Sequence, residues 1–130
     1  MVNKNIIITG GAGFIGYHLA KKLSSKNYNV YILDNLSKEK IDFDFKNLLK
    51  LNNIKFIKTD LRKKIKIPIS SAQHVFHLAG SVGVKNISRN PYESFMNNII
   101  SLKNVLDFCK KFKKTKIILF STSEVYSLSL

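Results

Sequence analysis

The chain has 130 residues, of which 45% are hydrophobic, with 22 Lys and Arg against 8 Asp and Glu and a formal net charge of +14. This length and composition predict one globular domain with its own core, and no stretch is apolar for long enough to span a bilayer. The amino terminus lacks a signal-peptide pattern, and the single Cys109 cannot form an internal disulfide. We therefore expect a cytoplasmic protein with no membrane partner.

The positive charge has two explanations. A basic chain can bind nucleic acid, in which case DNA affinity should fall steeply with salt. Here the lysines are scattered, Arg62 and Arg89 are the only arginines, and no nucleic-acid-binding motif accompanies the charge. The densest run, residues 110–114, follows a predicted helix, where cations complement the helix dipole. We therefore predict solvated lysines and no nucleic-acid partner.

The first predicted elements are a buried strand over residues 5–8 and a helix over residues 17–23, joined by the turn Thr9-Gly-Gly-Ala-Gly-Phe-Ile-Gly16. Three apolar residues are predicted to form the inner face of the helix: Ile15, Leu19 and Leu23. Gly10 permits the tight turn, Gly13 lets the backbone approach a pyrophosphate, and Gly16 lets the helix pack closely on the strand. The free N–H groups and the positive end of the helix dipole then face the anion.

Asp34 closes a second predicted strand, residues 29–33, close to the ~20 residues after the glycine turn at which a carboxylate grips the adenosine ribose. A carboxylate at this point would repel a 2′-phosphate. The sequence therefore predicts NAD rather than NADP as the cofactor, with a solvated aspartate at a strand end as the alternative. No metal site is predicted.

The remaining predicted strands are residues 54–58, 73–77 and 116–120. A variable helical connection is expected over residues 38–51, and no regular structure is expected over residues 61–71 or 81–90. From Pro91 the sequence predicts a long helix. An apolar stripe at helical spacing is expected to be its core-facing side: Phe95, Ile99, Leu102, Leu106 and Phe112.

Strands that alternate with helices and are apolar in the middle predict an α/β fold with a parallel sheet covered on both faces. Right-handed crossovers then give the Rossmann-like, doubly wound strand order 3-2-1-4-5. The fifth strand would be an exposed apolar edge that invites association.

Taken together, the motifs resemble those of the NAD-dependent epimerase/dehydratase family, the extended short-chain dehydrogenases that act on nucleotide sugars. The resemblance covers almost the whole chain and rests on residues 9–16, 34–37, 60–61, 77–80, 97–98 and 121–126. It implies NAD as the cofactor and a nucleotide sugar as the substrate. It also allows a homodimer.

The resemblance also implies the residues that hold the cofactor. The backbone of Phe14 and Ile15 would meet the pyrophosphate beside Gly10, Gly13 and Gly16. The other implied contacts are Asp34, Asn35 and Ser37 at the adenosine, Asp60 and Leu61 at the adenine, Leu78, Ala79 and Gly80 after the fourth strand, and Asn98 toward the nicotinamide half. Taken one at a time, each has a structural alternative: Asp60 as a strand-end cap, His77 as a core histidine, and Asn98 as a surface amide.

The catalytic residues implied are Thr122, Ser123 and Glu124, a Thr-Ser-Glu sequence closer to nucleotide-sugar decarboxylases and 4,6-dehydratases than to 4-epimerases. The Thr122 hydroxyl would bond the sugar hydroxyl that is oxidised. Transient oxidation to a ketone acidifies the neighbouring C–H or makes a β-keto acid, and Glu124 would serve as general base. The alternative is that Glu124 is a solvated loop acid.

The family's base, the tyrosine of a Tyr-x-x-x-Lys pair beyond the fifth strand, has no counterpart at that place in these residues. Tyr17 and Lys21 have this spacing, but they lie in the first predicted helix, where an i, i+4 pair is ordinary. We therefore interpret the sequence as the NAD-binding amino-terminal part of an enzyme, truncated after strand five and catalytically incomplete. The alternative is a non-catalytic module for dinucleotide binding or assembly.

Overall fold

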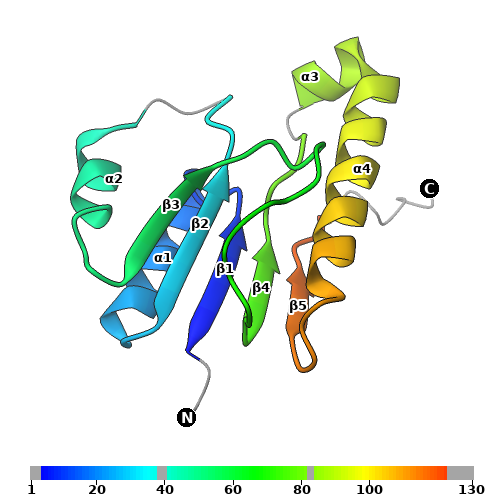
Figure 1. Cartoon of the computed structure of the whole chain (residues 1–130). Helices are drawn as coiled ribbons and strands as arrows, with labels where there is room; N and C mark the ends of the chain where they lie inside the picture. The colour runs from blue at the N-terminus through cyan, green and yellow to red at the C-terminus, as the bar shows by residue number, and fades with distance from the viewer. Residues whose placement is uncertain (1–3, 38–40, 82–83, 123–130) are drawn as a thin grey trace, which may run out of the picture.

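The computed structural model describes residues 4–37, 41–81 and 84–122. Within these ranges strands and helices largely alternate (Figure 1). The elements are β1 (Asn5–Thr9), α1 (Phe14–Ser25), β2 (Asn29–Asp34), α2 (Phe43–Leu48), β3 (Ile54–Lys58), β4 (His74–His77), α3 (Val84–Arg89), α4 (Pro91–Cys109) and β5 (Lys116–Leu119).

The five strands form one parallel sheet in the order β3-β2-β1-β4-β5, which confirms the predicted topology. At the centre, Ile6 of β1 lies in register with Val30 of β2 on one side and with His74 of β4 on the other. Because the strands are parallel, their carboxyl ends and the loops that follow them meet at one edge of the sheet. That edge carries most of the residues predicted to bind a ligand.

Two apolar cores lie on the two faces of the sheet, with α1 and α4 on opposite sides (Figure 1). Side chains of β1 alternate between them: Ile7 packs in the core under α4, and Ile6 and Ile8 pack in the core under α1. Burial on both faces explains why the middle of this strand, Ile6 to Ile8, is uniformly apolar.

The inner face of α1 differs from the prediction. Ile15 is 57% exposed, and the buried residues of the helix are small: Gly16, Ala20 and Ser24. Leu19 and Leu23 are half-buried and pack at the margin of the core. At Gly16 the first helical turn approaches the glycine turn too closely for any side chain, since a Cβ there would lie 2.5 Å from Gly11 Cα.

The long helix α4 was predicted in the right place but with the wrong face buried. Phe95, Ile99 and Leu106 are 62%, 47% and 43% exposed, and Leu102 is half-buried. The buried side is instead Ser94, Ser101, Val105, Phe108 and Cys109, while Phe112, just beyond the helix, is buried as predicted. This rotation places Val105, Phe108 and Cys109 in the core and turns polar residues toward the loops after β3 and β4, as described below. An apolar stripe in the sequence does not reveal it.

Two connections also depart from expectation. Part of the predicted loop over residues 81–90 is the short helix α3, whose six residues are too few to show a helical period in the sequence. The segment after β3 is irregular, as predicted, but its alternating isoleucines are buried in the core under α4: Ile65, Ile67 and Ile69. Lys63, Lys64 and Lys66 of the same segment are exposed, which accounts for part of the basic composition.

The lysines at the end of α4 have local partners. Lys110 Nζ lies 2.6 Å from an oxygen of Asp107, and Lys103 Nζ lies 2.8 Å from the other. The hydrogen bonds from these two lysines lower the pKa of Asp107 to about 2. Lys111 Nζ lies 4.1 Å from the centre of the Phe108 ring. Across the described ranges, none of the helices is both long and apolar enough to cross a membrane.

Candidate functional site

A cleft of about 580 Å³ opens along the carboxyl ends of the strands, a volume typical of small-molecule sites. It is lined by every residue that was predicted to hold the cofactor: Gly10, Gly13, Phe14, Ile15, Gly16, Asp34, Asn35, Ser37, Asp60, Leu61, Leu78, Ala79, Gly80 and Asn98. These residues come from five separate segments, so the fold gathers them into one place. Asn97 and Ser121 stand in the motifs that carry the resemblance, but sequence reasoning assigned them no cofactor contact. It also assigned none to the further lining residues Leu33, Thr59, Arg62, Ser81, Ser101 and Phe120.

The glycine turn forms one wall of the cleft. Gly10 has a φ of +67° and donates its N–H to Leu33 O at 2.8 Å, which links the turn to β2. A Cβ on Gly16 would lie 2.5 Å from Gly11 Cα, so only glycine permits this packing. A Cβ on Gly13 would meet nothing closer than Gly10 O at 3.4 Å. Gly13 therefore has open space beside it, at the N-cap of α1, and no side chain caps the helix there.

Asp34 is held at the end of β2 by two backbone donors. One carboxylate oxygen accepts from Ala12 N at 3.1 Å, and the other accepts from Leu36 N at 2.8 Å. The side chain thus connects the glycine turn to the loop after β2, where Leu36 adopts a φ of +57°. Each oxygen retains acceptor capacity, so the carboxylate is fixed and still able to receive hydroxyl hydrogens from a ligand.

The loop after β4 is tied to β1 by a buried polar contact. Thr9 Oγ1 lies 2.7 Å from His77 Nδ1 and accepts a hydrogen bond from Ala79 N at 3.3 Å. Burial lowers the pKa of His77 below its ordinary value of 6.5. A neutral ring can accept the Thr9 hydroxyl hydrogen at Nδ1. His77 therefore acts as a satisfied core histidine that fixes the loop carrying Ala79.

This contact predicts a pH dependence of stability. Because the folded protein holds His77 neutral, the unfolded chain takes up the extra proton as pH falls below about 6.5, and the free energy of unfolding should fall until the folded-state pKa is reached. Urea unfolding at pH 7, 6 and 5 measures this trend. His77→Gln should flatten it, whereas His18→Gln, which removes an exposed histidine, is the control. Equal slopes in wild type and His77→Gln would contradict the assignment.

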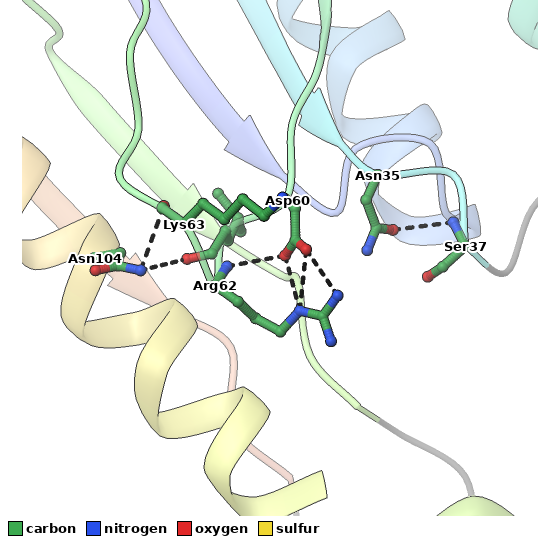
Figure 2. A network of polar contacts seen from close by, with 7 residues as sticks. Asn35, Ser37, Asp60, Arg62, Lys63 and Asn104 are labelled. Atoms are coloured by element: carbon green, nitrogen blue, oxygen red, sulfur yellow. Dashed lines mark hydrogen bonds and ion pairs between the residues drawn. The ribbon is translucent and has the colours of Figure 1, made fainter. Parts of the chain in front are cut away.

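The adenosine end predicted for the cleft is flanked by the loops after β2 and β3 (Figure 2). Asn35 Oδ1 accepts from Ser37 N at 3.0 Å. Across from it, Asp60 accepts from the Arg62 guanidinium, with the shortest contact at 2.7 Å, and from Arg62 N at 3.0 Å. The hydrogen bond from the Arg62 side chain holds the pKa of Asp60 below its usual value.

Asn98 of α4 braces the opposite end. Its Oδ1 accepts from Ser81 N at 2.6 Å, and its Nδ2 donates to Ser81 O at 3.3 Å. The amide thus holds the backbone of the loop after β4 while the residue lines the cleft.

The predicted catalytic stretch is only partly visible. Thr122 is exposed and follows Phe120 and Ser121, which line the cleft, but is not itself among the lining residues. Ser123 and Glu124 lie outside the described residues. Tyr17 and Lys21 are on α1, as predicted, with Lys21 Nζ 5.8 Å from the centre of the Tyr17 ring, and neither lines the cleft.

A parallel β3-β2-β1-β4-β5 sheet with a glycine turn after its central strand and a cleft at its carboxyl edge defines a Rossmann-like domain. More particularly, the chain belongs to the GDP-mannose 4,6 dehydratase family, whose profile matches residues 7–128.

Relatives support the same assignment. The chain is 39% identical over 127 residues to a UDP-N-acetyl-alpha-D-glucosaminuronate decarboxylase of Bacillus cytotoxicus, covering 96% of this chain and 38% of the relative. Among solved structures, the NAD-dependent NDP-hexosamine 5,6-dehydratase TunA superposes with a TM-score of 0.81 at 29% identity, covering 97% of this chain and 39% of TunA.

A UDP-glucose 4-epimerase from Bifidobacterium longum, solved with NAD+ and UDP, superposes with a TM-score of 0.79 at 28% identity, covering 95% of this chain and 38% of the epimerase. The chain thus spans about two fifths of the length of these three proteins. They include a decarboxylase, a dehydratase and an epimerase, so the likeness extends across all three reactions.

Proposed function

We propose that these residues form the NAD-binding part of an enzyme that acts on a nucleotide sugar by transient oxidation, as an epimerase, dehydratase or decarboxylase. The observation that carries the proposal is the cleft itself. It places the open side of Gly13 and the amino end of α1 in the same hollow as the fixed carboxylate of Asp34. The family membership and the NAD-dependent relatives support the same choice.

The residues present fit a dinucleotide. A diphosphate at the amino end of α1 would meet free N–H groups and the positive end of the helix dipole, and Gly13 leaves space for its approach. Asp34 would accept from the adenosine ribose hydroxyls and disfavour a 2′-phosphate, while Asp60 and Leu61 would border the adenine. When bound, NAD supplies reversible hydride acceptance. The chain's own part is to bind and orient the cofactor.

The catalytic roles remain part of the proposal. Thr122 would bond the sugar hydroxyl, and Ser123 and Glu124 would complete the stretch, with Glu124 as general base. Tyr17 cannot take the place of the family's tyrosine, because it packs against the core under α1 and away from the cleft. We therefore propose that residues 1–130 bind NAD, in the cytoplasm, without turning over a sugar.

Calorimetric titration of NAD into the purified chain tests this proposal. We expect a micromolar dissociation constant, a weaker one for NADP, and no change in added nucleotide sugars by chromatography. The sugar product is the readout because transient oxidation returns the hydride and leaves no NADH to measure. Folded protein that released no heat with NAD would overturn the cofactor assignment, and genuine sugar turnover would overturn the claim that these residues are catalytically incomplete.

The alternative is a module that mediates assembly, and one observation favours it. The outer side of α4 exposes an apolar row at helical spacing: Tyr92, Phe95, Ile99 and Leu106. Rows that repeat every three or four residues are typical of helices that pack against one another, so the partner proposed is a second copy of this chain. Sedimentation equilibrium over a range of concentrations distinguishes the outcomes: a homodimer supports assembly, and a monomer throughout contradicts it.

A further inference from the structure

A row of polar side chains on α4 faces the loops that border the cleft: Asn98, Ser101 and Asn104, at intervals of three residues. Asn98 holds the loop after β4 and Ser101 donates to Asn98 O at 3.0 Å. Asn104 makes contact elsewhere, with the loop after β3, and it does not line the cleft itself.

Asn104 binds two backbone carbonyls with one amide group. Its Nδ2 donates to Leu61 O at 2.8 Å and to Lys63 O at 3.3 Å, which lie 43 and 41 residues earlier in the chain (Figure 2). These carbonyls lie on either side of Arg62, so the amide holds the loop at two points.

The loop that Asn104 holds is internally folded. Lys63 N donates to Asp60 O at 3.0 Å, and Arg62 N donates to the Asp60 carboxylate at 3.0 Å. Its first residue is tied to β2 through Thr59 N and Asp34 O at 2.9 Å. The hydrogen bond to β2 therefore holds the first end of the loop, at Thr59. Asn104 attaches the other end of the loop to α4. Asp60, Leu61 and Arg62 form the cleft wall between these two attachments.

We propose that Asn104 is a positioning residue that fixes the Asp60–Arg62 wall for the adenosine half of the dinucleotide. This inference rests on the proposed function. Asn104 acts through the backbone of Leu61 and Lys63, and a shift of the wall would weaken the ligand contacts of Asp60 and Leu61. Without the amide, the loop keeps its internal turn but loses its attachment to α4.

The test is Asn104→Asp, which keeps the shape of the side chain but replaces its donor with an acceptor facing two carbonyls. Asn104→Ala is the second variant, and it suits a helix. Asn52→Asp, on an exposed turn before β3, is the control for the added charge. With AMP, ADP-ribose and NAD as probes, we expect both Asn104 variants to raise each dissociation constant about tenfold and the control to change none of them.

A double-mutant cycle separates positioning from a general effect on stability. If Asn104 acts through the loop, Asn104→Ala should weaken binding by a clearly smaller factor in an Asp60→Ala background than in wild type, because the Asp60 contact that it positions is already lost. If wild type binds NAD and both Asn104 variants bind it equally well, this inference alone is overturned. Additive effects of Asn104→Ala and Asp60→Ala on the dissociation constant would overturn it as well. No binding by folded wild type overturns the proposed function and this inference together.

Discussion

Gly13→Ala is expected to weaken NAD binding about a hundredfold while the protein remains folded. The new Cβ would meet only Gly10 O, at 3.4 Å, which is ordinary van der Waals contact. The backbone there has a φ of −73°, which any residue adopts, so stability should change by less than about 1 kcal/mol. The methyl group would instead occupy the space through which a diphosphate approaches the backbone.

Gly16→Ala, in the same turn, serves as the comparison, because it should reduce the stability of the fold and not act directly on NAD binding. Its Cβ would lie 2.5 Å from Gly11 Cα and 2.6 Å from Gly10 O, and neither backbone atom can move without breaking the turn. Overpacking of this kind costs about 1–3 kcal/mol or more. We therefore expect the main effect of Gly16→Ala to be a lower unfolding temperature, and not a direct effect on NAD binding.

Thermal unfolding and NAD titration of both variants check this pair of results. A folded Gly13→Ala variant that bound NAD as tightly as wild type would contradict a diphosphate site at the amino end of α1. A Gly16→Ala variant as stable as wild type would contradict the close packing of α1 on the turn.

Asp34→Asn is expected to reduce NAD affinity by about 10- to 100-fold and to reduce the preference for NAD over NADP. Hydrogen bonds that involve a charged group contribute about 1.5–3 kcal/mol, and the amide replaces one acceptor oxygen with a donor. The two backbone bonds from Ala12 and Leu36 cannot both be kept, so the carboxylate's fixed position is lost as well. Removing the negative charge also removes the repulsion of a 2′-phosphate.

Titrations of NAD and NADP into wild type and variant measure the ratio of the two dissociation constants. Asp44→Asn is the matched control, because it removes one negative charge from exposed α2 without lining the cleft. An unchanged ratio in Asp34→Asn would show that Asp34 does not select the cofactor, and an equal change in Asp44→Asn would indicate a general charge effect.

The strand order and the position of the cleft could be predicted because they follow from local patterns. Apolar runs such as Ile6 to Ile8 mark buried parallel strands, and right-handed crossovers leave few topologies. The roles of Gly10 and Gly16 in the turn were equally local, since a left-handed φ and a close backbone approach both require glycine.

What the sequence determined by itself was therefore the parallel sheet, the glycine turn and the residues that converge at its carboxyl edge. Only the tertiary structure decided which face of α4 is buried, and with it the roles of Asn98 and Asn104. It also decided the pairing of Thr9 with His77, 68 residues away. These features depend on how the helix packs and on contacts between distant segments. An apolar stripe along one helix does not show which of its faces the rest of the chain covers.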